Sequence, residues 1–191
     1  MASPPTDTQT KPGHVFGYGS LIFRPDLEYT SARWTRVPGW TRRFYQASTD
    51  HRGVPGAPGR VVTLLPEAGT DCWGVTYTVP GQAMCAMLER LDRREVGGYE
   101  RHYVTTYDAA EQPYHDTLLY LASEDNPAYA GPAPVATMAE QILHAVGPSG
   151  PNHEYLLKLA DALQTQGIHD SHVHTLADAV RALMQQTLPG R

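Results

Sequence analysis

The sequence predicts an α+β fold in which a sheet or small barrel is covered by helices. From His14 to about Ala122 the apolar residues come in short runs rich in β-branched and aromatic side chains, which are typical of strands. The last third instead carries apolar residues at helical spacing. Because strands come first and helices later, the chain lacks the strict alternation that marks a doubly wound parallel sheet.

Six runs predict strands, and turns rich in Gly, Pro and Asp separate them. The clearest run is VTYTV, residues 75–79, where Val75, Tyr77 and Val79 share one face and two threonines share the other. This alternation indicates a half-buried strand. The six predicted strands cover residues 14–18, 42–46, 60–65, 72–79, 101–107 and 115–122.

One predicted helix interrupts the strands. After Pro80, four apolar residues follow the spacing of one helical face, and Gly97-Gly98 is expected to end the helix. Glu95 is therefore expected at or just beyond the helix C-terminus. The four apolar residues are Met84, Met87, Leu88 and Leu91.

Three further helices are predicted in the last third. Thr137 and Glu140 form a capping-box pattern that begins the first, which Gly147-Pro148 should end. Asn152 is expected to cap a second helix that runs as far as Gly167. Ser171 is expected to cap the third.

The composition predicts one globular domain. The chain has 191 residues, of which 41% are hydrophobic and 18% charged, a length that suits a single core. Residues 1–13 are polar and proline-containing and are expected to form a flexible tail before a single domain over residues 14–188. Cys72 and Cys85 fit no zinc spacing, so we expect reduced, structural thiols, with a pairing of the two as the alternative.

Charge and hydropathy exclude several classes of partner. The net charge is −5 and no Lys/Arg run is present, which argues against nucleic acid or an anionic membrane surface as a partner. No apolar stretch approaches the roughly 20 residues of a membrane helix, and the first residues lack the features of a signal peptide. We therefore expect a cytoplasmic protein. The sequence does not set the oligomeric state.

The stretch HVFGYGSLI, residues 14–22, ends a predicted strand with two glycines around a tyrosine. A dinucleotide fingerprint would need a third glycine at Ile22 and a following amphipathic helix, and a nucleophile elbow would need glycines at Tyr18 and Ile22. Both patterns fail. The turn is either a simple glycine-permitted strand end or a site where bare backbone N–H groups cradle an anion or oxyanion.

A second candidate site is RREVGGYE, residues 93–100. A carboxylate at a helix C-terminus faces the negative end of the helix dipole, and burial would add to the same effect. Both would raise the pKa of Glu95 toward a range in which it exchanges a proton at neutral pH. The alternative is a solvated glutamate among charged neighbours.

Two other regions contain candidate ligand-binding side chains. Arg52 lies in the loop ASTDHRGVPGAPG, residues 47–59, where a guanidinium could bind a carboxylate and where the loop could act as a lid. Tyr155 lies on the apolar face of its predicted helix and is otherwise a core tyrosine. The histidines at 169, 172 and 174 do not share a helical face, so no metal site is expected there.

Seven segments in the same order resemble the ChaC-like γ-glutamylcyclotransferases, most closely the glutathione-specific type. The resemblance runs from about His14 to Leu163. The segments are VFGYGSLI, QASTDHRGVPGAPGRVVTL, WGVTY, LDRREVGGYE, DNPAYAGPAP, AEQI and GPSGPNHEYLLKLA.

The resemblance implies a small mixed β-barrel with flanking helices, a substrate-binding turn and a single catalytic glutamate, which is Glu95 here. It implies glutathione as substrate, with no metal and no cofactor. Arg52 and Tyr155 fall in well-matched segments and are expected substrate contacts. The implied substrate-binding residues are Val15, Phe16, Gly17, Tyr18, Gly19, Ser20, Leu21, Arg52 and Tyr155.

Three other functions stay open at this point. A related cyclotransferase could act on other γ-glutamyl amino acids or amines. A non-catalytic sensor could bind a γ-glutamyl ligand, although binding alone does not need a base such as Glu95. A serine hydrolase with Ser20 as nucleophile would release free glutamate in place of a lactam.

Overall fold

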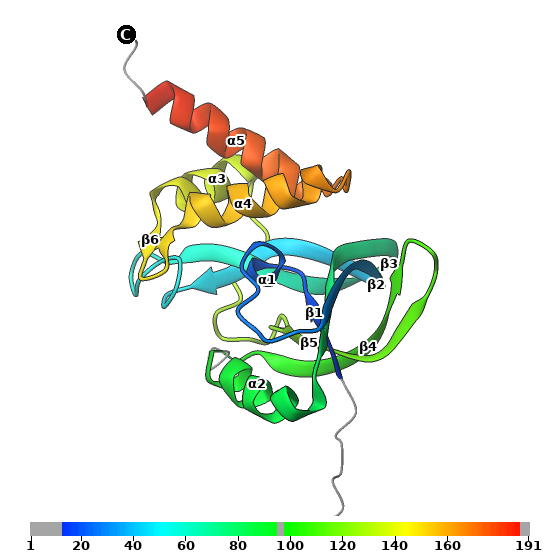
Figure 1. Ribbon diagram of the computed structural model, residues 1–191. Coiled ribbons are helices and arrows are strands. Elements are labelled where there is room, and N and C mark those ends of the chain that lie inside the picture. The colour runs from blue at the N-terminus through cyan, green and yellow to red at the C-terminus, as the bar shows by residue number, and fades with distance from the viewer. Residues whose placement is uncertain (1–12, 95–97, 188–191) are drawn as a thin grey trace, which may run out of the picture.

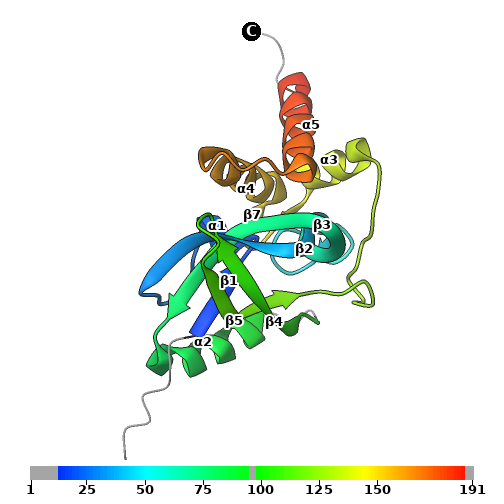
Figure 2. The same cartoon turned by 90° about the vertical axis from the view of Figure 1, so that its right-hand side faces the viewer.

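The computed structural model describes residues 13–94 and 98–187 and has the predicted α+β architecture. Five strands form a closed barrel, with α2 on one side and α3, α4 and α5 on the other (Figures 1 and 2). The barrel strands are β1 (Gly13–Gly17), β2 (Ser31–Ser48), β3 (Gly59–Val79), β4 (Glu100–Asp108) and β5 (Pro113–Leu121). The helices are α1 (Ser20–Phe23), α2 (Gly81–Arg94), α3 (Val135–His144), α4 (Asn152–Thr165) and α5 (Ser171–Thr187).

The barrel closes through β1, which is the shortest of its strands. β1 pairs antiparallel with β3, Gly17 lying opposite Val75, and parallel with β5, Val15 lying opposite Leu118. The order around the barrel is β1, β3, β2, β4, β5. Because closure leaves β1 between two neighbours, the residues that follow Gly17 begin at a fixed place on the barrel rim.

Two of the predicted strands are one strand. The segments 60–65 and 72–79 both belong to β3, although PEAGTD, residues 66–71, reads as a turn. β2 pairs with β3 on both sides of this segment, Trp40 with Pro66 and Pro38 with Asp71, so the extra residues form a bulge. β2 is also longer than predicted, because it begins at Ser31 and continues through this irregular region.

The predicted helices are present, but the predicted caps are wrong. α3 begins two residues before Thr137, has Pro134 at its N-cap position without a side-chain cap, and ends at His144 before Gly147-Pro148. Asn152 is the first residue of α4 and its side chain is used elsewhere. α5 is capped by the residue before Ser171, since the Val173 N–H donates to Asp170 Oδ1 at 3.1 Å. Gly167 follows α4 with a φ of +69°, as the predicted helix end requires.

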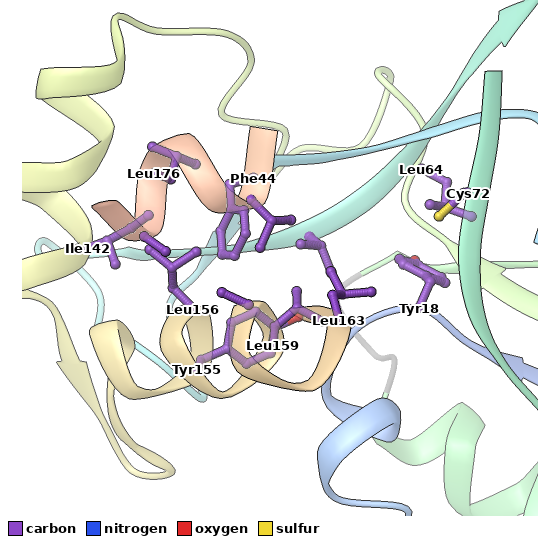
Figure 3. Packing of buried hydrophobic residues seen from close by; sticks show 14 of the residues in the cluster. Tyr18, Phe44, Leu64, Cys72, Ile142, Tyr155, Leu156, Leu159, Leu163 and Leu176 are labelled. Carbon is purple, nitrogen blue, oxygen red and sulfur yellow. The ribbon is translucent and has the colours of Figure 1, made fainter. Parts of the chain in front are cut away.

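Two hydrophobic clusters hold the helices on the barrel. The larger one joins β2 and β3 to α3, α4 and α5, and Figure 3 shows Phe44 among Leu156, Leu159 and Leu176. The smaller one joins β1, β3 and β5 to α2 through Met87. The larger cluster also contains Tyr18 and Tyr155, so the core extends up to the residues that the sequence singled out.

A short hairpin precedes α4, and Cys72 lies buried in the core. β6 (Val146–Gly147) pairs with β7 (Gly150–Pro151). Cys72 is buried and free, its pKa is raised by burial, and Arg42 Nη2 donates to its sulfur at 3.4 Å.

None of the helices in residues 13–94 and 98–187 combines the length and apolarity that crossing a lipid bilayer requires.

Candidate active site

The seven residues from Val15 to Leu21 line a cavity of about 390 Å³ at the end of β1. Arg52 from the loop after β2 and Tyr155 from α4 line the same cavity. The structure thus brings together all nine residues that the resemblance implies for substrate binding. Glu95, the implied catalytic residue, lies outside the described residues, although α2 ends at the residue before it.

Tyrosine hydroxyls hold both ends of the glycine-rich turn. Tyr18 donates its hydroxyl to the Tyr120 carbonyl on β5 at 2.6 Å, and Tyr77 on β3 donates to the Leu21 carbonyl at 2.7 Å. Within the turn, the Ile22 N–H donates to the Gly19 carbonyl at 3.0 Å. The carbonyls of Gly19 and Leu21 are thus used within the protein, and the three bonds together fix the direction of the backbone at the cavity wall.

Gly19 is required because neighbouring side chains leave no room for another residue. A Cβ atom at this position would lie 2.7 Å from the Tyr155 hydroxyl and 2.8 Å from a Val62 methyl group. Gly17 is similarly restricted, since its Cβ would lie 2.6 Å from that of Leu21. The two glycines therefore permit close packing of backbone against the cavity walls.

Arg52 and Tyr155 form a buried pair beside the turn. The Arg52 side chain is 7% exposed, its guanidinium lies 5.6 Å from the centre of the Tyr155 ring, and it donates to the Pro151 carbonyl at 3.2 Å. Burial lowers the pKa of Arg52, yet a guanidinium remains charged at neutral pH. The pair offers a fixed positive charge suited to a carboxylate.

The loop that carries Arg52 is tied to its surroundings by backbone hydrogen bonds. The Ser149 N–H donates to the His51 carbonyl at 2.9 Å, and the Arg52 N–H donates to Ser48 Oγ at 2.9 Å. Val54 and Ala57 exchange two further backbone bonds. These contacts hold the base of the predicted lid against the β6–β7 hairpin.

A buried amide anchors the helix that carries Tyr155. Asn152 Oδ1 accepts from the Arg60 N–H at 2.6 Å, and its Nδ2 donates to the Arg60 carbonyl at 2.8 Å. Asn152 is fully buried, so both bonds form away from solvent. This pairing joins the first residue of α4 to β3 and explains why the asparagine does not cap its own helix.

Of the three histidines near α5, His172 contacts the core residue Phe44. His172 Nε2 accepts the Phe44 N–H at 3.0 Å, and burial lowers the pKa of His172 to about 4. His169 and His174 stack on each other with ring centres 5.3 Å apart. Within residues 13–94 and 98–187, no three His, Cys, Asp or Glu side chains gather in a way that could hold a metal ion.

Sequence reasoning did not identify the cavity residues on β2. In the structure, buried and less buried residues alternate along the second half of this strand. Arg42, Phe44, Gln46 and Ser48 all point inward, and the polar pair Gln46 and Ser48 reaches the cavity. The sequence signal for Gln46 is a glutamine within a predicted strand, because glutamine is usually an exposed residue. Other lining residues that were not singled out include Arg24, Asp26, Tyr99, Tyr120 and Ser149.

A closed five-stranded barrel with flanking helices and a partly polar cavity places the protein in the γ-glutamylcyclotransferase-like fold class. The chain belongs to the ChaC-like protein family, whose profile matches residues 14–183. Both the family and the barrel with flanking helices were predicted from the sequence and are confirmed.

Curated relatives and solved structures cover most of the chain. The human glutathione-specific gamma-glutamylcyclotransferase 1 is 46% identical over 176 residues, which is 89% of this chain and 79% of that protein. The Schizosaccharomyces pombe glutathione-specific gamma-glutamylcyclotransferase is 35% identical over 191 residues, covering 91% and 94% of the two chains. The crystal structure of a glutathione-specific γ-glutamyl cyclotransferase from yeast aligns with a TM-score of 0.83 at 30% identity, over 90% of this chain and 96% of that one.

Proposed function

We propose that this protein is a glutathione-specific γ-glutamylcyclotransferase, which converts glutathione to 5-oxoproline and Cys-Gly. The observation that carries the proposal is the similarity over nearly the whole domain to relatives from human, mouse and fission yeast that carry this name. The gathering of residues 15–21, Arg52 and Tyr155 around one cavity supports it.

The proposed reaction takes place within one substrate molecule. The α-amino nitrogen of the γ-glutamyl unit attacks its own γ-carbonyl carbon and forms the C–N bond of a five-membered lactam. The amide bond to cysteine breaks, and its nitrogen leaves as the amine of Cys-Gly. One proton moves from the attacking nitrogen to the leaving nitrogen, so no water is consumed. Because the nucleophile belongs to the substrate, we propose that the reaction needs no cofactor and no metal.

Holding the substrate folded back is the first task of the site. Free glutathione rarely brings its amine onto its own γ-carbonyl, so a pocket that selects this conformation lowers the entropic part of the barrier. The turn from Gly17 to Leu21 is suited to this role because its glycines let the substrate lie against the backbone. Its N–H groups would bind the developing oxyanion or the substrate's α-carboxylate.

Two side chains are proposed to complete substrate binding. The buried charge of Arg52 suits one of the two carboxylates of glutathione. Tyr155, whose hydroxyl adjoins the space beside Gly19, would limit the width of the pocket at the turn. Both roles are proposals that substitution can test.

Glu95 is proposed to move the proton. A carboxylate of raised pKa can accept the proton that the α-amino nitrogen loses as it forms the lactam and return it to the departing amine. Its position in the chain, directly after α2, fits a group that faces the negative end of a helix dipole. Ser20 is proposed to position the substrate and not to attack it.

The direct test is product identity. Purified protein is incubated with glutathione, and 5-oxoproline and Cys-Gly are measured by mass spectrometry. We expect the two products in equal amounts, with no free glutamate and no acylated protein. Failure to form 5-oxoproline at high protein concentration would refute the proposal, and free glutamate would favour a hydrolase that uses Ser20.

One relative favours testing a wider substrate range. The Arabidopsis thaliana gamma-glutamylcyclotransferase 2-3, at 39% identity over 180 residues, is not named for glutathione. A comparison of kcat/KM for glutathione and for γ-glutamyl-alanine separates the strict enzyme from a general one. Equal kcat/KM values for the two substrates would show that the enzyme accepts γ-glutamyl compounds in general and is not specific for glutathione.

A further inference from the structure

Gln46 carries a polar atom that the rest of the described protein does not use. The side chain is 2% exposed and lines the cavity. Its Oε1 atom is buried and has no hydrogen-bond partner among the residues that the structure describes. A buried acceptor without a donor lowers the stability of the folded protein. In a binding pocket, a donor on the bound ligand can satisfy such an acceptor.

The orientation of the Gln46 amide is set by its neighbour. Asn126 accepts the Ala128 N–H on Oδ1 at 2.8 Å and donates from Nδ2 to the Gly98 carbonyl at 2.8 Å. These two bonds fix which end of the Asn126 amide is oxygen. Gln46 must then donate its Nε2 to Asn126 Oδ1, at 3.1 Å, which leaves Oε1 as an acceptor.

The Gln46 and Asn126 pair also lies beside the chain that follows Glu95. Gly98 has a φ of +84°, and a Cβ atom there would lie 2.6 Å from Asn126 Nδ2, so the backbone packs directly on this amide. Gly98 is three residues after the proposed base. The Gln46 amide is therefore linked through Asn126 to the backbone of Gly98, which follows the proposed base closely in the chain.

We propose that Gln46 Oε1 accepts a hydrogen bond from the α-amino group of the γ-glutamyl substrate and so positions the nucleophile, an inference that rests on the proposed function. Arg24 and Arg52, which also line the cavity, are donors and suit the substrate's carboxylates, not its amine. The acceptor is uncharged. A carboxylate there would stabilise the ammonium and oppose its deprotonation, whereas an amide oxygen orients the amine with less effect on its pKa.

The test compares two inert glutathione analogues by calorimetry. A sulfonamide analogue, with SO2 in place of the γ-carbonyl, keeps the α-amino group, and glutaryl-Cys-Gly lacks it. We expect Gln46→Met to weaken binding of the sulfonamide analogue by roughly 10-fold or more, the usual effect of losing a hydrogen bond to a charged group. Binding of glutaryl-Cys-Gly should change by less than about 2-fold, since it makes no such bond.

A matched control and a second variant guard against a purely structural effect. Thr63→Val removes a buried hydrogen bond to the Ala122 carbonyl outside the cavity and should alter neither affinity. Gln46→Glu restores an acceptor, so it should keep the preference for the amino-bearing analogue. It should also turn over glutathione more slowly at neutral pH and shift the rising limb of the pH profile of kcat upward, because the carboxylate raises the pKa of the substrate amine.

Three outcomes would overturn the inference. If Gln46→Met weakens both analogues equally, the acceptor binds another donor or acts on the fold. If it weakens neither, Oε1 does not contact the substrate. If Gln46→Met does not fold and Gln46→Glu shows no preference between the analogues, the positioning role also fails. In each case wild-type formation of 5-oxoproline, measured in parallel, shows whether the proposed function stands without it; absence of that product would remove both.

Discussion

The two sides of the barrel differ in how they are built. The side covered by α3, α4 and α5 contains the larger hydrophobic cluster and buried polar links such as the Asn152 side chain bound to the Arg60 backbone. The side covered by α2 has a smaller cluster, to which the helix contributes the buried Met87. The first side supplies Tyr155 and supports Arg52, whereas the second leads directly into Glu95.

We infer that the two sides have different roles in the proposed reaction. Substrate binding needs walls that hold a folded-back chain within fractions of an ångström, which favours the densely packed side. Proton transfer needs one carboxyl group of suitable pKa, which can stand at the end of a helix with fewer contacts. Substitutions on the two sides should therefore separate stability and binding from turnover, and four experiments test that expectation.

The largest effect is expected at Glu95. Glu95→Gln removes the proposed proton carrier but keeps the size of the side chain, so kcat for glutathione should fall by about 10³-fold or more. The midpoint of urea unfolding should stay unchanged. Glu100→Gln, at an exposed acidic residue on β4, is the matched control and should leave kcat within about twofold. Full activity of Glu95→Gln would move the base elsewhere.

Core truncations on the two sides should differ in stability. Leu159→Ala opens a cavity in the fully buried larger cluster and should cost about 4 kcal/mol of unfolding free energy. Met87→Ala, at 4% exposed in the smaller cluster, should cost about 2 kcal/mol. Urea titrations monitored by circular dichroism measure both. Equal losses would show that the α2 side is packed as tightly as the other.

The Asn152 link tests whether the dense side supports binding. Asn152→Ala removes two buried hydrogen bonds to Arg60 and should cost about 2 kcal/mol of stability. Because α4 carries Tyr155, KM for glutathione should rise while kcat changes little. Asn152→Asp keeps the acceptor for the Arg60 N–H but sets a buried carboxylate oxygen against the Arg60 carbonyl, so it should not restore wild-type stability. An unchanged KM in a destabilised Asn152→Ala protein would uncouple the helix anchor from the pocket.

The smallest effect concerns pH and the α5 side. His172 has an ordinary pKa of 6.5 that burial lowers to about 4 in the folded protein, where its Nε2 accepts the Phe44 N–H. The unfolded chain thus binds more protons between these values, so the contribution of His172 is complete above pH 6.5 and is lost as the pH falls toward 4. The loss should be about 1–2 kcal/mol, since the ring is partly exposed.

Urea unfolding at pH 7.5 and pH 5 measures this contribution in wild type and in His172→Gln, which cannot titrate. The wild type should lose more stability than the variant between the two pH values. Parallel losses in the two proteins would assign the acid sensitivity to other groups.

Much of the fold could be predicted because local pattern and tertiary context agree. The alternation in VTYTV predicts a strand of the barrel, and the spacing from Met84 to Leu88 predicts α2; both elements are present. The continuity of β3 could not be predicted. The segment from Pro66 to Asp71 has the composition of a turn, and only pairing with β2 on both sides carries the strand through it.

Caps failed for a similar reason. Asn152 is of a residue type that often caps helices, but its amide forms hydrogen bonds with two backbone groups of a strand far away in the sequence. Asp170, one residue before the predicted Ser171, takes the cap of α5. A polar side chain can bond either to backbone groups near it in the sequence or to groups that the fold brings close. The sequence alone does not show which of these partners lies within hydrogen-bond distance.

The class of fold and the family could be inferred from the chain alone, because periodicity and motif order are properties of the sequence. That the turn at residues 15–21, Arg52 and Tyr155 share one cavity depends on the tertiary structure, since they meet through barrel closure and the docking of α4. The same is true of the Gln46 acceptor, which has no partner among the described residues. Burial and hydrogen-bond satisfaction depend on which distant segments pack together, and that is settled only when the whole chain folds.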